Sequence, residues 1–356
     1  MVKTAVVFTP KYFLHNPGRT HPESAERLRV MISEVEDSGL LKTGNCSLME
    51  PKPARIGDVE LVHDVDYIKL MDKVCKSGGG LLDRGDTVAS SESFDVALHA
   101  VGGVLEATEL VMRRKFQNAF ALVRPPGHHA GPYRACGFCI FNNVAIAATH
   151  LLERFNLKRV LILDIDAHHG NGTQEIFYSS DKVLYISLHQ DPRGFPGTGF
   201  VDEVGEGEGL GYNVNIPFPF RTGDRNYLAA LSQIVAPIIE QYKPQFMLAS
   251  VGFDGHYADP IASLSLSALC YHKVFERALN LASRLCSGRF VAVLEGGYAL
   301  SFVGKMAAAA IAQMSGTDYK LTDNIPTVRE NVCKQGEIVI KEVMDVQGSF
   351  WEFHLG

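Results

Sequence analysis

The chain has 356 residues, of which 46% are hydrophobic and 21% are charged, and its formal net charge at pH 7 is −6. This composition is typical of a globular protein with a sizeable core, and the acidic balance argues against a protein that wraps nucleic acid. No apolar run reaches the roughly 20 residues that span a bilayer, and seven scattered cysteines are typical of a reducing compartment. We therefore expect a soluble, cytoplasmic protein that binds neither membranes nor nucleic acid directly.

Short β-branched runs alternate along the chain with longer amphipathic runs. Near-continuous apolar character predicts strands buried on both faces at residues 4–9, 119–124, 160–164, 183–188, 245–252 and 290–294. Helical periodicity predicts helices, the first with Ser24 as its N-cap, at residues 24–38, 95–115, 143–155, 227–242, 267–285 and 302–314. This alternation predicts an α/β fold with an open, mainly parallel sheet and helices on both faces.

No internal repeat, low-complexity block or Pro/Gly-rich linker divides the sequence, so residues 1–356 are expected to form one domain. Two predicted connections, residues 76–93 and 188–211, are long for a compact domain. Long loops on a rigid sheet usually carry function or disorder. The sequence does not define their conformations.

The pair Cys136 and Cys139 has the spacing of a redox site or of half a zinc knuckle. A knuckle needs a second pair with matching spacing, and the other five cysteines do not provide one. A thioredoxin-type site and a pair of buried small side chains both stay open, and the second interpretation is favoured.

Four polar segments follow the ends of predicted strands, and they contain most of the unusual residues of the chain. In a parallel sheet the carboxyl ends of the strands lie on one edge, where ligands bind in open α/β folds. We therefore expect four segments that are far apart in sequence to converge, namely residues 124–131, 164–172, 252–260 and 295–298.

Asp166 and His168 are two residues apart after one strand, so their side chains can point the same way, and Asp254 follows another strand. Two carboxylates and one imidazole form the three-ligand set of a catalytic metal ion. Such an ion would also explain how carboxylates are tolerated beside a buried strand. Zinc is the leading choice, with Fe(II), Co(II) and Mn(II) left open. The alternative is a capped strand end with a core histidine.

His128 and His129 are adjacent imidazoles, which suit proton transfer near neutral pH. A buried histidine needs a partner that orients its ring, and Asp164 could orient one of the two while Asn171 orients the other. Tyr298 follows two glycines, and its phenol could stabilise an oxyanion. Together these groups describe metal-assisted hydrolysis, against the alternatives of a solvated histidine pair and a tyrosine that only packs.

These motifs resemble those of the zinc-dependent histone deacetylase and acetylpolyamine amidohydrolase superfamily. Within it, they resemble the class II and bacterial or archaeal branch. The similarity extends over about residues 5–310, in "HPESAERL", "RPPGHHA", "GFCIFNN", "DIDAHHGNGTQEIFY", "ISLHQ", "FPGTG", "VGFDGHYADP" and "LEGGYAL". It implies a single-domain arginase-like fold and hydrolysis of the acetyl group from an N-acetylated lysine or polyamine, with release of acetate.

Several site residues are implied by this resemblance. The zinc ligands would be Asp166, His168 and Asp254, and His129 would be the general base and acid. His128 would assist with Asp164 as its orienting partner, Asn171 stands where some members have Asp, and Tyr298 would polarise the acetyl carbonyl. The substrate contacts would be Gly137, Phe138 and Phe195 as tunnel walls, Asp86 and Ile261 at the rim, and Arg27 on the acetate side.

The resemblance also implies sites for K⁺ or Na⁺, because members of the superfamily hold monovalent cations. One site would be formed by Asp164, Asp166, His168, Ser187 and Leu188. The other would be formed by Phe177, Val183 and Tyr212.

Two other functions remain as alternatives. A ureohydrolase of the arginase type uses two manganese ions and would need further carboxylates at positions that hold Gly170 and His256. A non-catalytic binder of acetylated ligands is disfavoured because every expected chemical group is present. The sequence leaves open whether the substrate is protein acetyl-lysine, an acetylpolyamine or another small acetylated amine, and whether the chain forms a homo-oligomer.

Overall fold

An eight-stranded sheet forms the centre of the computed structural model, which describes residues 4–353. The strand order is β2-β1-β5-β10-β9-β6-β7-β8, and every neighbouring pair is parallel. A separate antiparallel hairpin is formed by β3 and β4. The strands are β1 Thr4–Val7, β2 Cys46–Met49, β3 Gly79–Leu81, β4 Val88–Ser90, β5 Asn118–Ala121, β6 Val160–Asp164, β7 Val183–Gln190, β8 Asn213–Phe218, β9 Phe246–Val251 and β10 Phe290–Leu294.

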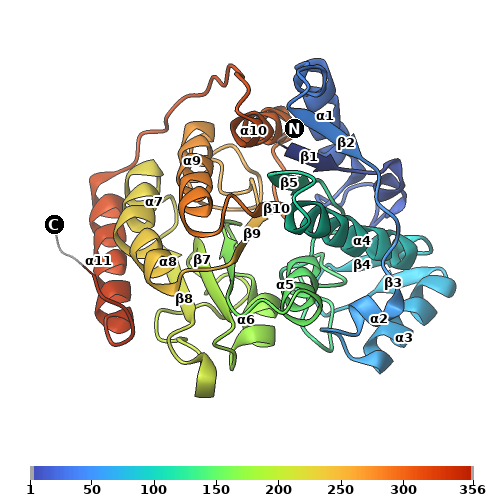
Figure 1. Ribbon diagram of the computed structural model, residues 1–356, viewed down its shortest axis with the longest axis horizontal. Coiled ribbons are helices and arrows are strands. Elements are labelled where there is room, and N and C mark those ends of the chain that lie inside the picture. Colours follow the sequence, from blue (N-terminus) through green and yellow to red (C-terminus); the bar gives the residue numbers. More distant parts are fainter. Residues whose placement is uncertain (1–3, 354–356) are drawn as a thin grey trace.

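Helices cover both faces of this sheet, which confirms the predicted α/β architecture (Figure 1). On one face α4 packs against β1 and β5, and α5 against β6 and β9, while α10 packs on the other face with α1 and α9. The helices are α1 Ala25–Asp37, α2 Ile56–Val59, α3 Val65–Lys76, α4 Ser93–Met112, α5 Asn143–Arg154, α6 Asn171–Phe177, α7 Asp224–Ala230, α8 Ala236–Tyr242, α9 Ala268–Leu285, α10 Leu300–Ser315 and α11 Glu330–Gln347.

All six predicted strands are present, and β6, β9 and β10 are buried along their whole length. Their apolar runs have no alternation because helices cover both faces. Between sheet and helices, the ring of Phe120 on β5 lies 6.5 Å from Phe253 and 6.3 Å from Phe275 of α9. These three rings belong to the buried core that joins the sheet to α9.

Several local predictions need correction. The helix expected over residues 227–242 is divided into α7 and α8 by a π-helical turn at Leu231–Val235, and Pro237, which has no N–H to donate, stands at the start of α8. Ser24 occupies the N-cap of α1, but its side chain makes no capping hydrogen bond. The loop at residues 76–93 contains the β3–β4 hairpin, and the one at 188–211 begins with the end of β7.

After α10 the chain runs through an irregular segment, residues 317–329, which we call the strap. Figure 1 shows it arching over the molecule from α10 to α11. The last helix, α11, then packs against α7 and β8. These elements were not predicted, and they place the C-terminal part of the chain along the edge of the sheet.

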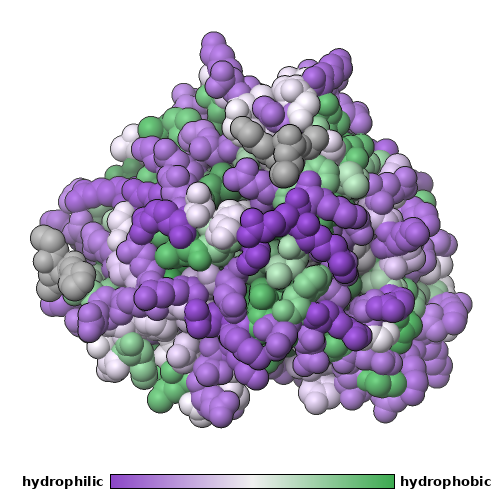
Figure 2. Space-filling view, in the orientation of Figure 1, coloured by the Kyte–Doolittle hydropathy of each residue, from purple (hydrophilic) through white to green (hydrophobic). Residues whose placement is uncertain are grey.

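The surface seen in Figure 2 is mostly hydrophilic, with apolar side chains in separate small patches. Within residues 4–353, no helix combines the length and the apolar character that crossing a bilayer requires.

Candidate active site

The four polar segments predicted to converge do meet at the carboxyl edge of the sheet. They follow β5, β10, β9 and β6, which are four consecutive strands at its centre. They surround a cavity of about 420 Å³ whose lining includes His128, His129, Asp166, His168 and Tyr298. The fold therefore brings the predicted acid–base groups and metal ligands to one place.

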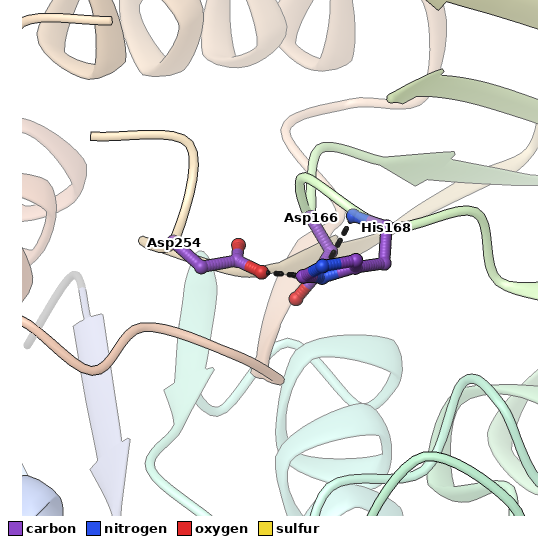
Figure 3. A group of neighbouring side chains, drawn as sticks. All are labelled: Asp166, His168 and Asp254. Carbon is purple, nitrogen blue, oxygen red and sulfur yellow. Dashed lines mark hydrogen bonds and ion pairs between the residues drawn. The ribbon is translucent and has the colours of Figure 1, made fainter. Parts of the chain in front are cut away.

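Asp166, His168 and Asp254 form a compact cluster with ligand atoms within 4.8 Å of one another. Figure 3 shows Asp254 reaching from the loop after β9 toward the other two residues on the loop after β6. Nδ1 of His168 lies 2.8 Å from Oδ2 of Asp254 and 3.4 Å from Oδ1 of Asp166. Both carboxylates are almost completely buried. Two buried carboxylates facing one imidazole are a donor set that fits a divalent cation.

The electrostatics of this cluster favour positive charge. Burial lowers the pKa of His168, but hydrogen bonds and charges from Asp166 and Asp254 outweigh it and raise the pKa to about 10. Backbone amides hold the carboxylates in place, with Gly296 N–H donating to Oδ2 of Asp166 at 2.8 Å and Ala167 N–H donating to Oδ1 of Asp254 at 3.0 Å. The three side chains are thus fixed in an arrangement suited to a metal ion.

Two glycines leave room for the carboxylate of Asp166. A Cβ atom on Gly252 would overlap Oδ2 of Asp166, and one on Gly296 would lie 2.6 Å from the same oxygen. A side chain at either position would have to displace Asp166, because real Cβ atoms do not approach so closely.

We predict that Gly252→Ala weakens divalent-ion binding by about 10–100-fold, as the loss of outer-shell contacts does. The added methyl group pushes the Asp166 carboxylate out of position. Competition between the protein and a chelator for Co²⁺ measures the affinity. Gly194→Ala is the matched control, because its Cβ would meet only Cζ of Phe220 at an ordinary 3.9 Å. Unchanged Co²⁺ affinity in the Gly252 variant would contradict the prediction.

His128 is paired with Asp164, as the sequence predicts. Nδ1 of His128 lies 3.0 Å from Oδ2 of Asp164, and the Tyr185 hydroxyl donates to the same oxygen at 3.0 Å. Burial lowers the pKa of His128, but the charges of Asp164, Asp166 and Glu295 outweigh it and raise the pKa to about 10. His128 is therefore positively charged at neutral pH.

His129 has a neutral partner and the opposite charge state. Its Nδ1 lies 2.8 Å from Oδ1 of Asn171, and since an amide oxygen only accepts, Nδ1 carries the proton. Burial, together with the charge of His128, keeps the pKa of His129 well below its usual value. The imidazole is neutral with a free Nε2, which is the state that a general base needs.

Tyr298 lies at the cavity with its ring held on two sides. The ring centroid is 6.0 Å from that of Phe138 and 4.7 Å from the guanidinium carbon of Arg27. Its backbone N–H donates to Oδ2 of Asp259 at 2.7 Å. Burial raises the pKa of the phenol well above its usual value, so the hydroxyl keeps its proton and can donate it in a hydrogen bond.

Arg27 does not line the cavity, contrary to the expectation. Its Nε and Nη2 donate to the carbonyl oxygens of Gly297 and Glu295, both at 2.6 Å, and Nη1 pairs with Glu23 at 3.0 Å. These partners hold the buried guanidinium against the Tyr298 ring, where it fixes the backbone of residues 295–297. Arg27 thus supports the site without lining the cavity.

The other predicted substrate residues do line the cavity, namely Asp86, Gly137, Phe138, Phe195 and Ile261. Gly137 and Phe138 form a tight turn with φ values of 53° and 69°, and the Phe195 ring lies 4.9 Å from that of His129. Asp86 lies between β3 and β4, and its carbonyl oxygen is 3.0 Å from Nε2 of His21. The rings of Phe138 and Phe195 thus line the cavity, and that of Phe195 lies beside the imidazoles of His129 and His168.

The cysteines that flank this turn are both free. Cys139 is completely buried, and its thiol donates to the Gly137 carbonyl oxygen at 3.3 Å. Burial raises the pKa of both thiols, that of Cys139 well above its usual value. This environment favours the packing interpretation, since reactive thiols have lowered pKa values.

The predicted monovalent-cation residues fall into two groups at opposite ends of β7. Ser187 and Leu188 lie near its carboxyl end, where Ser187 pairs in register with Asp164 and its Oγ is 2.8 Å from Nδ1 of His189. Val183 begins the strand, with Phe177 at the end of α6 and Tyr212 just before β8. Both cation sites stay predictions.

Sequence reasoning missed several residues of the site. Glu295 is buried, and its carboxylate accepts hydrogen bonds from the backbone N–H groups of Gly127 and His128 at 2.7 and 3.2 Å. A charged residue directly after an apolar strand was the available signal. Gln190, Phe220 and Ser263 also line the cavity. Gln190 ends β7 within the motif "ISLHQ", whereas Phe220 and Ser263 come from loops without a recognisable pattern.

The two positions where a second metal would need carboxylates do not provide them. Gly170 has no side chain, and Nε2 of His256 lies 3.0 Å from Oδ2 of Asp323. Among residues 4–353, Asp166, His168 and Asp254 are the one group of three such ligands. This arrangement disfavours a binuclear ureohydrolase site.

Comparisons with known proteins agree with this geometry. The model of the histone deacetylase domain matches residues 21–314. A probable deacetylase of Archaeoglobus fulgidus is 40% identical, with 98% of this chain and 99% of that protein covered. A histone deacetylase-like amidohydrolase of Pseudomonas aeruginosa is 36% identical, with 85% and 79% covered. The crystal structure of the HDA15 HD domain superposes with a TM-score of 0.88 at 34% identity, covering 98% of this chain and 95% of that one.

Proposed function

The chain belongs to the histone deacetylase family and is a hydrolytic deacetylase, and on this basis we propose that it is a zinc enzyme that removes acetyl groups from aliphatic amines. The proposed substrate is an acetyl-lysine side chain or an acetylpolyamine. We also propose that the protein is cytoplasmic, as its composition leads us to expect. The observation that carries it is the convergence of three metal-ligand side chains, a neutral imidazole and a phenol on one aromatic-walled cavity.

Asp166, His168 and Asp254 would hold the ion. When bound there, the metal would polarise the acetyl carbonyl and lower the pKa of water. The rings of Phe138 and Phe195 pack against the aliphatic stem of the amine and exclude water from the site.

Proton transfer falls to His129. Its free Nε2 takes the proton of the attacking water and later gives it to the departing amine, while Asn171 keeps the ring in the required tautomer. Tyr298 donates a hydrogen bond to the carbonyl oxygen as negative charge develops on it. The positive charge of His128, maintained by Asp164, favours the same negative charge.

The experiment that tests this function is acetate release by the zinc-loaded protein. An acetyl-lysine peptide and N-acetylputrescine are compared at equal concentrations, each with a chelator-treated sample and with zinc added back. We expect acetate from at least one substrate, loss of the activity on chelation and its return with zinc. Preference for the peptide identifies a protein lysine deacetylase, and preference for the small amine a polyamine deacetylase. No acetate from either substrate, with zinc bound, would overturn the proposal.

A further inference from the structure

The strap between α10 and α11 lies beyond the residues matched by the family model, yet it reaches the turn that carries Asp254. The contact is made by Asp323, whose side chain is 1% exposed. Its Oδ2 lies 3.0 Å from Nε2 of His256 and accepts the backbone N–H of Ala268 at 2.7 Å. Its Oδ1 accepts the Tyr257 hydroxyl at 3.0 Å. One buried carboxylate thus ties the strap to residues 256–257 and to the start of α9.

His256 depends on this carboxylate. Its ring is completely buried between Tyr257 and Phe302, with ring centroids 4.4 Å away on both sides. Nδ1 accepts the backbone N–H of Ala258 at 3.3 Å, so the proton is on Nε2 and is donated to Asp323. Without Asp323 this buried N–H would lose its partner, which is costly.

The turn held in this way connects two parts of the active site. Asp254, a metal ligand in the proposed function, stands at its beginning. At its end, the Asp259 carboxylate accepts the backbone N–H of Tyr298 at 2.7 Å and that of Ile261 at 2.9 Å. Movement of the turn would therefore displace a metal ligand, the phenol-bearing residue and the rim of the cavity together.

We propose that Asp323 is a positioning residue of the active site, which fixes the turn at residues 254–259 from the strap. It acts through His256 and Tyr257 and does not line the cavity. The inference rests on the proposed function, because it takes Asp254 as a metal ligand and Tyr298 as the oxyanion donor.

The test compares Asp323→Asn with Asp318→Asn, the same substitution at an exposed position of the strap. In Asp323→Asn we expect Co²⁺ affinity, measured by competition with a chelator, to fall about 10-fold, within the range for outer-shell partners. The visible absorption bands of the Co²⁺-loaded protein should shift, and kcat should fall about 10-fold with KM changed by less than about twofold. Asp318→Asn should match the unsubstituted protein in every readout.

A folded Asp323→Asn protein with unchanged Co²⁺ affinity and spectrum would overturn the inference. If that variant does not fold, Tyr257→Phe tests the inference instead, because it removes one hydrogen bond to Asp323 and leaves the aromatic ring in place. It should weaken Co²⁺ binding about threefold, and unchanged binding would overturn the inference. Absence of acetate release by the unsubstituted protein would instead refute the proposed function, while the Co²⁺ comparison would still stand.

Discussion

Tyr298→Phe is expected to lower kcat by about 10²–10³, the usual effect of removing one oxyanion donor, without loss of the metal. The substitution removes only the hydroxyl group, and the ring contacts with Phe138 and Arg27 can persist. The kcat of the zinc-loaded variant and its metal content are the two measurements, made with whichever substrate releases acetate faster.

Tyr133→Phe is the matched control, since Tyr133 is 70% exposed and does not line the cavity. It should leave both kcat and metal content unchanged. Normal turnover in the Tyr298 variant would exclude the phenol as the oxyanion donor.

Asp254→Ala is expected to abolish stable metal binding and, with it, acetate release. The variant loses one of only three side-chain ligands, so its effect should exceed the roughly 100-fold upper range for outer-shell partners. His168 keeps Asp166 as a partner at 3.4 Å, and one of two repelling buried carboxylates is removed, so the protein should still fold. Elemental analysis of the purified variant measures the metal, and thermal unfolding checks the fold.

Asp345→Ala, at an exposed position of α11, is the control for a lost carboxylate remote from the cavity. It should retain full metal occupancy and full activity. Full zinc occupancy in the Asp254 variant would refute the assignment of Asp254 as a ligand.

The central fold could be predicted because its sequence signals are local. The apolar runs of β6, β9 and β10 are unbroken since both faces of these strands are covered. Weaker signals were missed at the sheet edges, where the four residues of β2 include only one that is fully buried. The helix α3 was also missed, although its sequence carries a start signal. Asp64 is its N-cap and accepts the backbone N–H groups of Asp66 and Tyr67.

The candidate site was predictable where chemical groups directly follow a strand, as Asp166, His168 and Asp254 do. Other roles depend on contacts between distant residues. Arg27 was expected in the cavity, but carbonyl groups about 270 positions away hold it behind Tyr298. Asp323 meets His256 across 67 positions. No local pattern encodes such pairings, because they arise only when segments far apart in sequence are folded together.

The position of α11 bears on how this protein can associate with other chains. An open strand edge offers unpaired backbone groups to a strand of another molecule. At β8, the last strand of the sheet, α11 packs alongside, and Nε2 of Gln347 donates to the backbone carbonyl of Asn213 at 3.1 Å. This helix therefore blocks intermolecular strand addition at one side of the sheet. At the opposite side, β2 is only four residues long and offers a short template for such pairing.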